Sequence, residues 1–360
     1  MAKTIDFPIF KTKTPGVTGK YDFSDPVARQ AYFEAKAGNE IERLKKFFAA
    51  KGTFIAYLLA KKAAGKGTYA RMLVEIFSPD YLVHLSVGDI VRSVDEEVSD
   101  QEKRADLEKF LKSHYRGYQS VEGVFADQKN RDTKGLSHSA ETILALLERE
   151  ISRLGKKSFL IDGFPRNLDQ VSYSLFFRQL VGYRDDPDFF ALIQIPESVI
   201  DARMKNRVVC PRCQLSRSLM LLPTKEVGYD EEAKEFFLKC ENPDCRGERL
   251  MPKEGDNLGI ENIRDRLDRD EELVRRALDL YGVPKVLLRN AIPVDQAREM
   301  VDDYELTPEY YYHWDPKLKK VTTLEKPWII KDDAGIDSYS LLAPAVVVSF
   351  IKQMAETLGV

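Results

Sequence analysis

Long apolar segments are missing from this chain of 360 residues. No stretch approaches the ~18 uncharged apolar residues of a membrane-spanning helix, and the longest apolar run, near residues 341–351, is too short. The first ten residues also lack the long apolar core of a secretory signal. We therefore expect a cytoplasmic protein with no membrane partner.

A strong excess of one charge is missing as well. The 55 lysines and arginines nearly balance the 58 aspartates and glutamates, which gives a formal net charge of −3, and no long basic run stands out. Because nucleic-acid-binding domains are usually basic, the sequence predicts no nucleic-acid partner. Apolar residues make up 43% and charged residues 31%, which is typical of a globular protein. The length suits one core with inserted subdomains, or two domains.

Cysteine is scarce, and its placement is informative. The four cysteines form two tight pairs, Cys210 with Cys213 and Cys240 with Cys245, and residues 214–239 between the pairs can form a hairpin. In a reducing compartment such cysteines are metal ligands more often than disulfides, and paired knuckles deliver four thiolates to Zn²⁺. Four ordinary buried cysteines are the alternative, which the tight pairing disfavours. Four protein ligands leave no open coordination position, so we expect the Zn²⁺ to be structural.

Strands alternate with helices along most of the chain, which predicts an α/β fold with a parallel sheet. Short apolar runs predict strands at residues 53–59, 81–85, 158–162 and 191–195. Periodicity and helix-start signals predict helices at 25–50, from 67 onward, and at 95–112, 139–154, 260–281 and 341–358. We expect an irregular arm over 1–24, a loop or hairpin over 304–326 and a further strand over 328–331.

Residues 60–68 (AKKAAGKGT) follow an expected strand and precede an expected helix, where a phosphate-binding loop belongs. Backbone N–H groups at the start of that helix can wrap phosphates, and Lys66 can reach the outer ones. Ala60 stands where the first glycine of the pattern is expected, and an alanine with φ > 0 would cost ~1–2 kcal/mol. A plain strand-turn-helix with solvated lysines is the alternative, and this loop alone does not decide between the two.

Three further segments follow in a fixed order: 85–92 (LSVGDIVR), 161–170 (IDGFPRNLDQ) and 196–207, where Arg203 and Arg207 lie four residues apart on one face of an expected helix. In order and spacing these segments resemble the adenylate kinase family over about residues 53–281. The resemblance implies a P-loop NTPase-type parallel sheet flanked by helices, with an inserted monophosphate-binding subdomain and a zinc-ribbon lid. It also implies reversible phosphoryl transfer, ATP + AMP = 2 ADP, with Mg²⁺ accompanying ATP.

The resemblance also implies roles for particular residues. Phosphoryl transfer needs donor and acceptor in line and the charge of the moving group neutralised. The residues implied for ATP are Ala64, Gly65, Lys66, Gly67, Thr68, Arg203 and Arg207. Those implied for AMP are Arg92, Arg166 and Gln170, and those implied for catalysis are Lys66, Arg166, Arg207, Asp162 and Arg266. Asp162 would hold Mg²⁺ through water.

The segment after the lid departs from the family pattern. Lys253 stands in place of an arginine and Gly255 in place of the first of two aspartates, while Asp256 remains. Because lysine is a point charge where arginine is a planar fork, lid closure or rate can differ here. A second family arginine is best matched by Arg266, with Arg264 as a rival.

The resemblance divides the chain into four parts. They are an N-terminal arm and helix (1–50), a core (51–92, 133–207 and 258–360), an enlarged monophosphate-binding insertion (93–132) and a zinc-binding lid (208–257). It gives no role to residues 1–50, 93–132 or 285–335, and it names no protein partner for the N-terminal arm.

Two alternatives stay open. The first is a kinase for another nucleoside monophosphate. Gln170 favours adenine because its amide can both donate to and accept from the base edge, whereas Val87 stands where a threonine near the AMP base is usual. The second is a catalytically weakened nucleotide-binding or scaffold protein, which the loop residues Ala60, Lys62 and Ala63 favour.

Overall fold

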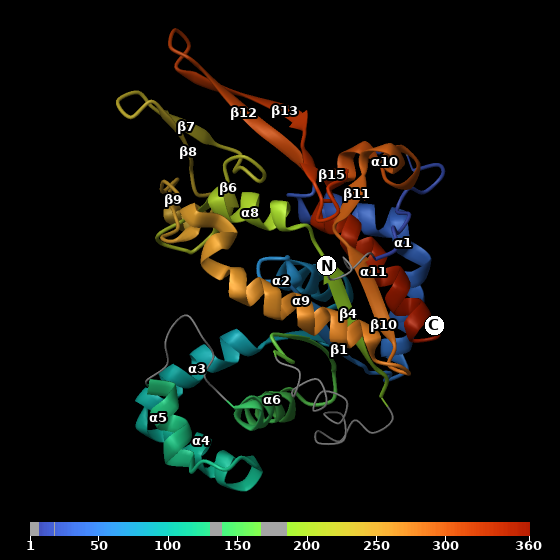
Figure 1. The fold of residues 1–360 in the computed structure, drawn as a ribbon, viewed down its shortest axis with the longest axis vertical. Helices are drawn as coiled ribbons and strands as arrows, with labels where there is room; N and C mark the ends of the chain where they lie inside the picture. Colours follow the sequence, from blue (N-terminus) through green and yellow to red (C-terminus); the bar gives the residue numbers. More distant parts are fainter. Residues whose placement is uncertain (1–6, 18, 130–138, 167–185) are drawn as a thin grey trace.

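A five-stranded parallel sheet forms the centre of the protein in the computed structural model, which describes residues 7–17, 19–129, 139–166 and 186–360 (Figure 1). The strand order is β10-β4-β1-β3-β2, and all four pairings are parallel. The strands are β1 (Ile55–Ala60), β2 (Leu82–Ser86), β3 (Ser158–Asp162), β4 (Asp188–Gln194) and β10 (Lys285–Arg289). The predicted α/β fold with a parallel sheet is confirmed, and the edge strand β10 is an addition that the sequence pattern did not indicate.

Helices cover both faces of this sheet. All six residues of β1 are buried, and because successive side chains of a strand point to opposite faces, they divide between two hydrophobic cores. Ala56, Leu58 and Ala60 belong to one core, and Ile55, Tyr57 and Leu59 to the other. The first core includes residues of α1 (Pro26–Ala49), α2 (Lys66–Phe77) and α11 (Ala343–Thr357); the second includes residues of α6 (Ala140–Leu154) and α9 (Arg264–Asp279).

The N-terminal arm is part of the folded body. Asp25 caps α1 through its carboxylate, and Pro26 occupies the first helical position, where its missing N–H has no consequence. The arm also crosses the edge of the sheet: the Phe7 N–H donates to Gln194 Oε1 at 3.0 Å, and Arg289 donates to the Phe7 carbonyl at 3.0 Å. The bounds of α1 confirm the helix expected over 25–50.

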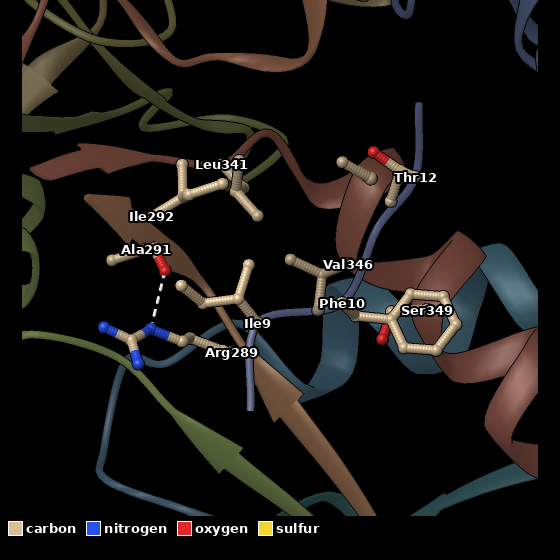
Figure 2. Close-up of a pocket in the computed structure, with 10 residues that line it drawn as sticks. Ile9, Phe10, Thr12, Arg289, Ala291, Ile292, Leu341, Val346 and Ser349 are labelled. Atoms are coloured by element: carbon tan, nitrogen blue, oxygen red, sulfur yellow. Dashed lines mark hydrogen bonds between the residues drawn. The ribbon is translucent and has the colours of Figure 1, made fainter. Parts of the chain in front are cut away.

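A small pocket lies where the arm crosses the edge of the sheet. Figure 2 shows Ile9 and Phe10 of the arm beside Val346 of α11, with Arg289 donating to the carbonyl of Ala291 at 2.8 Å. Apolar side chains from three separate parts of the chain line it, so the arm closes this edge rather than leaving it open.

The insertion after β2 is built from three helices in the described residues. They are α3 (Val87–Ser99), α4 (Gln101–His114) and α5 (Val121–Lys129). The single helix expected over 95–112 is wrong, because the chain breaks at Asp100, whose extended backbone and carboxylate cap α4 by accepting from the N–H groups of Glu102 and Lys103. Figure 1 shows these helices on the side of the sheet away from the lid.

The lid contains two small antiparallel sheets. One joins β5 (Arg207–Val209) to β6 (Ser216–Ser218) and β9 (Met251–Pro252), and the other pairs β7 (Val227–Asp230) with β8 (Glu235–Leu238). The expectation of a hairpin within 214–239 is confirmed by β7 and β8. The chain returns through a short 3-10 stretch, η2 (Asp256–Ile263), which interrupts the long helix expected over 260–281; α9 begins only at Arg264.

A second hairpin, formed by the C-terminal part of the chain, lies against the lid. Its strands are β12 (Pro308–Asp315) and β13 (Lys320–Pro327), and they project beside β7 and β8 (Figure 1). Trp314 stacks on Tyr229 with ring centroids 5.1 Å apart, and the hydroxyl of Tyr312 donates to the Leu219 carbonyl at 2.6 Å. Residues 304–326 were expected to form a loop or hairpin, and the hairpin fastens the lid to the C-terminal part.

The rest of the C-terminal part forms a small antiparallel sheet of β11 (Ala291–Pro293), β14 (Ile329–Lys331) and β15 (Asp337–Ser340), with the short helix α10 (Val294–Met300) beside it. The strand expected over 328–331 and the final apolar helix are confirmed by β14 and α11. Among the described residues, no helix has the length and apolar character needed to cross a membrane.

Candidate active site

The loop between β1 and α2 has the strand-turn-helix geometry expected of a phosphate loop. Lys66 is the first residue of α2, so the N–H groups of Lys66 and Gly67 have no carbonyl one turn earlier in the helix, while the Thr68 N–H donates to the Gly65 carbonyl at 2.9 Å. Positive φ occurs at Ala63 (64°) and Gly65 (97°). Ala60 is instead the last residue of β1, so the strain expected at Ala60 is found at Ala63.

Lys66 and Asp162 meet at the carboxyl ends of the strands. Asp162 is the last residue of β3 and lies in register with Leu58 of β1 and Ser86 of β2. The ammonium Nζ of Lys66 donates to the Ala60 carbonyl at 3.1 Å and lies 3.8 Å from Asp162 Oδ1. Because carboxyl ends of parallel strands share one edge of the sheet, the two charged groups share one site.

Arg166 and Arg266 extend this site. Arg166 Nε donates to the Gly163 carbonyl at 2.7 Å, and burial, followed by the positive charge of Arg266, lowers the pKa of Arg166 to about 10. Arg266 Nε lies 3.9 Å from Asp270 Oδ2, one helical turn further along α9. A phosphate bound here would offset the repulsion between the two guanidinium groups.

Asp270 is a site residue that the sequence reading missed. Its Oδ2 accepts from the backbone N–H of Lys62 at 2.8 Å, so it anchors the phosphate loop to α9. Burial raises the pKa of Asp270, although Lys66, Arg266 and Arg166 act in the opposite direction. The sequence feature that could have indicated Asp270 is its position four residues after Arg266, because this spacing places both side chains on one face of a helix.

Lys61, which lies in the same loop as Lys66, forms ion pairs that hold the loop in place. Its Nζ lies 2.9 Å from Glu197, 2.8 Å from Glu271 and 3.8 Å from Asp333. Burial alone would lower the pKa of Lys61, but hydrogen bonds to Glu271 and Glu197 raise it. The alternative of solvated loop lysines is therefore wrong for Lys61, which is buried among three carboxylates.

The base of the lid holds Arg203 and Arg207, but not on one helix. Arg203 is in α8 (Glu197–Lys205), where it hydrogen-bonds the buried hydroxyl of Tyr69. Arg207 lies beyond the end of α8, in β5, and grips both oxygens of Asp256 at 2.5 and 2.7 Å. The expected shared helical face is wrong, because pairing of β5 with β6 and β9 ends the helix.

Of the two rival arginines on α9, Arg266 lies in the site. Arg264 forms ion pairs with Glu197 and with Glu261, and the bond to Glu197 raises the pKa of Arg264. Its guanidinium is thus turned to the cluster around Lys61 rather than to Arg166.

Arg92 is not brought to this cluster. Arg92, in α3, is exposed and pairs with Asp89, while the first turn of α3 is capped by the Ser86 hydroxyl, which accepts from the Asp89 N–H at 3.3 Å. Gln170 lies outside the described residues. Of the expected AMP-binding residues that the structure describes, Arg166 lies in the cluster and Arg92 does not.

The four cysteines form the candidate metal centre in the lid. One ligand atom from each of Cys210, Cys213, Cys240 and Cys245 lies within 4.8 Å of all the others, and the Cys213 and Cys240 sulfurs are 3.5 Å apart. A tetrahedron of thiolates ~2.3 Å from Zn²⁺ has edges of roughly 3.8 Å. The four sulfurs fit a closed four-thiolate site, and three of the four cysteines are buried.

Comparison with known proteins gives one matching family model, described as an AAA domain, over residues 63–212. A protein of Clostridium acetobutylicum named adenylate kinase is 33% identical over 172 residues, which is 48% of this chain and 67% of that protein. Adenylate kinases of Thermotoga petrophila and Staphylococcus epidermidis are 28% and 29% identical over 238 and 231 residues, or 65% and 64% of this chain and 89% and 87% of theirs.

Proposed function

Because this chain belongs to the adenylate kinase family and is a nucleoside monophosphate kinase, we propose that it converts ATP and AMP reversibly into two ADP. The observation that carries the proposal is the group formed by Lys66, Asp162, Arg166 and Arg266 at the carboxyl ends of the strands. In-line phosphoryl transfer needs little covalent chemistry from a protein; it needs positioned cations and exclusion of water.

On the donor side, the backbone N–H groups of Ala64, Gly65, Gly67 and Thr68 would surround the phosphates of ATP, because these residues form the loop and the first turn of α2. Lys66 would exchange its bond to the Ala60 carbonyl for the β- and γ-phosphates. Arg203 would lie against the ATP base, and Arg207 would reach its phosphates by leaving Asp256 as the lid closes.

Mg²⁺ would accompany ATP, and Asp162 would hold it through water, since Mg²⁺ in such sites binds one or two carboxylates, waters and substrate phosphates. The metal supplies charge neutralisation between the phosphates when bound. The carboxylate of Asp162 fits this role because it lies 3.8 Å from the ammonium of Lys66, beside the same phosphates.

On the acceptor side, Arg166 and Arg92 would clamp the phosphate of AMP, because a guanidinium fork suits bidentate binding. Arg92 would have to exchange its exposed pairing with Asp89 for this phosphate. Gln170 would read the adenine edge by donating to one nitrogen and accepting from the amino group.

The lid would be held in shape by a structural Zn²⁺ on the four cysteine thiolates. Residues 208–257 would move as this lid, residues 93–132 would enlarge the monophosphate-binding insertion, and 51–92, 133–207 and 258–360 would form the core, with 1–50 as arm and helix.

The experiment compares AMP, UMP, CMP and GMP as acceptors for Mg·ATP in a coupled assay, with wild type and Gln170→Ala. We expect kcat/KM for AMP to exceed the others by at least about tenfold, since a buried unpaired hydrogen-bonding group costs ~1–3 kcal/mol. Gln170→Ala should reduce this preference without weakening ATP binding. Equal use of all four acceptors by the wild type would contradict AMP specificity, and nucleotide binding without turnover would favour a catalytically weakened protein.

A further inference from the structure

Two adjacent lysines of the phosphate loop have opposite surroundings. Lys61 is buried among the carboxylates of Glu197, Glu271 and Asp333. The side chain of Lys62 is half-buried, yet no carboxylate of the part of the chain that the structure describes pairs with its ammonium group. Only the backbone of Lys62 is held, by the bond from its N–H to Asp270. A desolvated lysine without a carboxylate partner is unusual, because burial of an unpaired charge is costly.

The charges that face Lys62 are mostly positive. After burial, Arg266, Arg207 and Lys253 are the groups that lower the pKa of Lys62, and Asp256 is the main opposing charge. Asp256 is itself already engaged, because Arg207 grips both of its oxygens. Cations from the lid base (Arg207) and from α9 (Arg266) therefore surround Lys62 of the loop.

An anion of high charge bound among these cations would stabilise them further. The phosphate chain that passes from donor to acceptor is an anion of this kind. The Lys62 N–H donates to Asp270 Oδ2 at 2.8 Å, and the same oxygen lies 3.9 Å from Arg266 Nε, so the Lys62 backbone is held beside a cation of the proposed transfer site.

We propose that Lys62 is a further catalytic residue, whose ammonium contacts the phosphoryl group in transit between the two nucleotides. This inference rests on the proposed function. In the transfer, the bond from the γ-phosphorus to the β–γ bridging oxygen breaks, and a bond forms from that phosphorus to an oxygen of the AMP phosphate. The bridging oxygen keeps the electron pair as part of ADP, and Lys62 keeps its protons and contributes charge alone.

This role explains why two lysines can occupy positions next to each other in one tight loop. Lys61 ties the loop to α8, α9 and the segment between β14 and β15, whereas Lys62 leaves its ammonium for substrate. Ala63, which follows the two lysines, has a strained φ of 64°. The side-chain contacts of Lys61 and the backbone bond from Lys62 to Asp270 hold the loop just before it.

The test compares Lys62→Met and Lys62→Arg with Lys61→Met and wild type. Lys62→Met should lower kcat by roughly ten- to hundredfold, the effect of losing one charge-assisted bond, with KM for each nucleotide changing less and the melting temperature staying within about 1 °C of wild type. Lys62→Arg should recover most of the loss. Lys61→Met should instead lower the melting temperature, because it removes an ion-pair partner from each of three carboxylates.

Binding of inorganic triphosphate by titration calorimetry separates this inference from the proposed function. Weaker triphosphate binding by Lys62→Met than by wild type supports the contact even if the wild type transfers no phosphoryl group, which would refute only the kinase reaction. Kinetic constants and triphosphate affinity of Lys62→Met within twofold of wild type overturn the inference. So does a loss that Lys62→Arg does not recover and that accompanies a lowered melting temperature.

Discussion

Removal of the buried charge of Lys36 should destabilise the protein more than any surface lysine can. The Lys36 side chain is 0% exposed, and its Nζ lies 2.6 Å from Asp302, 3.4 Å from Glu305 and 3.1 Å from the Thr12 carbonyl. Glu305 is also 0% exposed and accepts from the hydroxyls of Tyr32 and Thr12 at 2.5 and 2.7 Å. These contacts join the N-terminal arm, α1 and the segment after α10.

Lys36→Met would keep most of the side-chain volume but leave Glu305 as a buried carboxylate without a cation. Breaking a buried ion pair in this way costs about 3–5 kcal/mol. At about 2 °C per kcal/mol for a large chain, the melting temperature should fall by roughly 6–10 °C. Burial and the charge of Glu305 together hold the pKa of Tyr32 well above its usual range, so Tyr32 stays a neutral hydrogen-bond donor to Glu305.

The assay is calorimetry or urea unfolding of wild type, Lys36→Met, Lys36→Met/Glu305→Gln and Lys45→Met. Lys45 is the matched control because it lies on the same helix, is 44% exposed and pairs with Glu34 and Glu42 at 3.6 and 3.4 Å. Exposed pairs contribute at most about 1 kcal/mol. Glu305→Gln should restore part of the loss. If Lys36→Met costs no more than Lys45→Met, the arm is not fastened by this network.

Three more predictions concern the phosphate loop, the metal centre and the lid. Lys66→Ala should abolish turnover with little change in melting temperature, and near-normal activity would remove the phosphate-loop assignment. Purified protein should contain about one Zn²⁺ per chain, and Cys240→Ser should lower the melting temperature; reduced protein that carries no metal and does not respond to chelators would contradict this. Trp314→Ala should remove about 0.5–1.5 kcal/mol of aromatic contact with Tyr229 and speed amide exchange in β7 and β8, and unchanged exchange there would mean that the hairpin does not restrain the lid.

Local patterns predicted the core of this protein well. The run at 158–162 forms β3 within the expected bounds, because a short apolar segment ending in aspartate suits a buried parallel strand. The tight cysteine pairs likewise meet in one cluster. Lys66 was located by its place between a strand and a helix, and Asp162 by the family resemblance; the two lie together because the carboxyl ends of parallel strands share one edge of the sheet.

Residues brought together by tertiary contacts were not predicted. Lys61 meets carboxylates from positions 197, 271 and 333, and no local spacing links them. Arg207 was assigned to a helical face by its distance from Arg203, but strand pairing in the lid overrides that spacing. The strain was expected at Ala60 and occurs at Ala63, because the strand continues one residue further before the loop turns.

The reaction itself is tested most directly by supplying ADP alone with Mg²⁺ and following the products by chromatography. An enzyme that binds one ADP as phosphoryl donor and another as acceptor must form ATP and AMP in equal amounts. We predict this result for the wild type and its loss in Lys66→Ala. A kinase specific for another monophosphate, or a protein that only binds nucleotides, leaves ADP unchanged. Persistence of ADP in the presence of folded, zinc-loaded protein would refute the proposed adenylate kinase reaction.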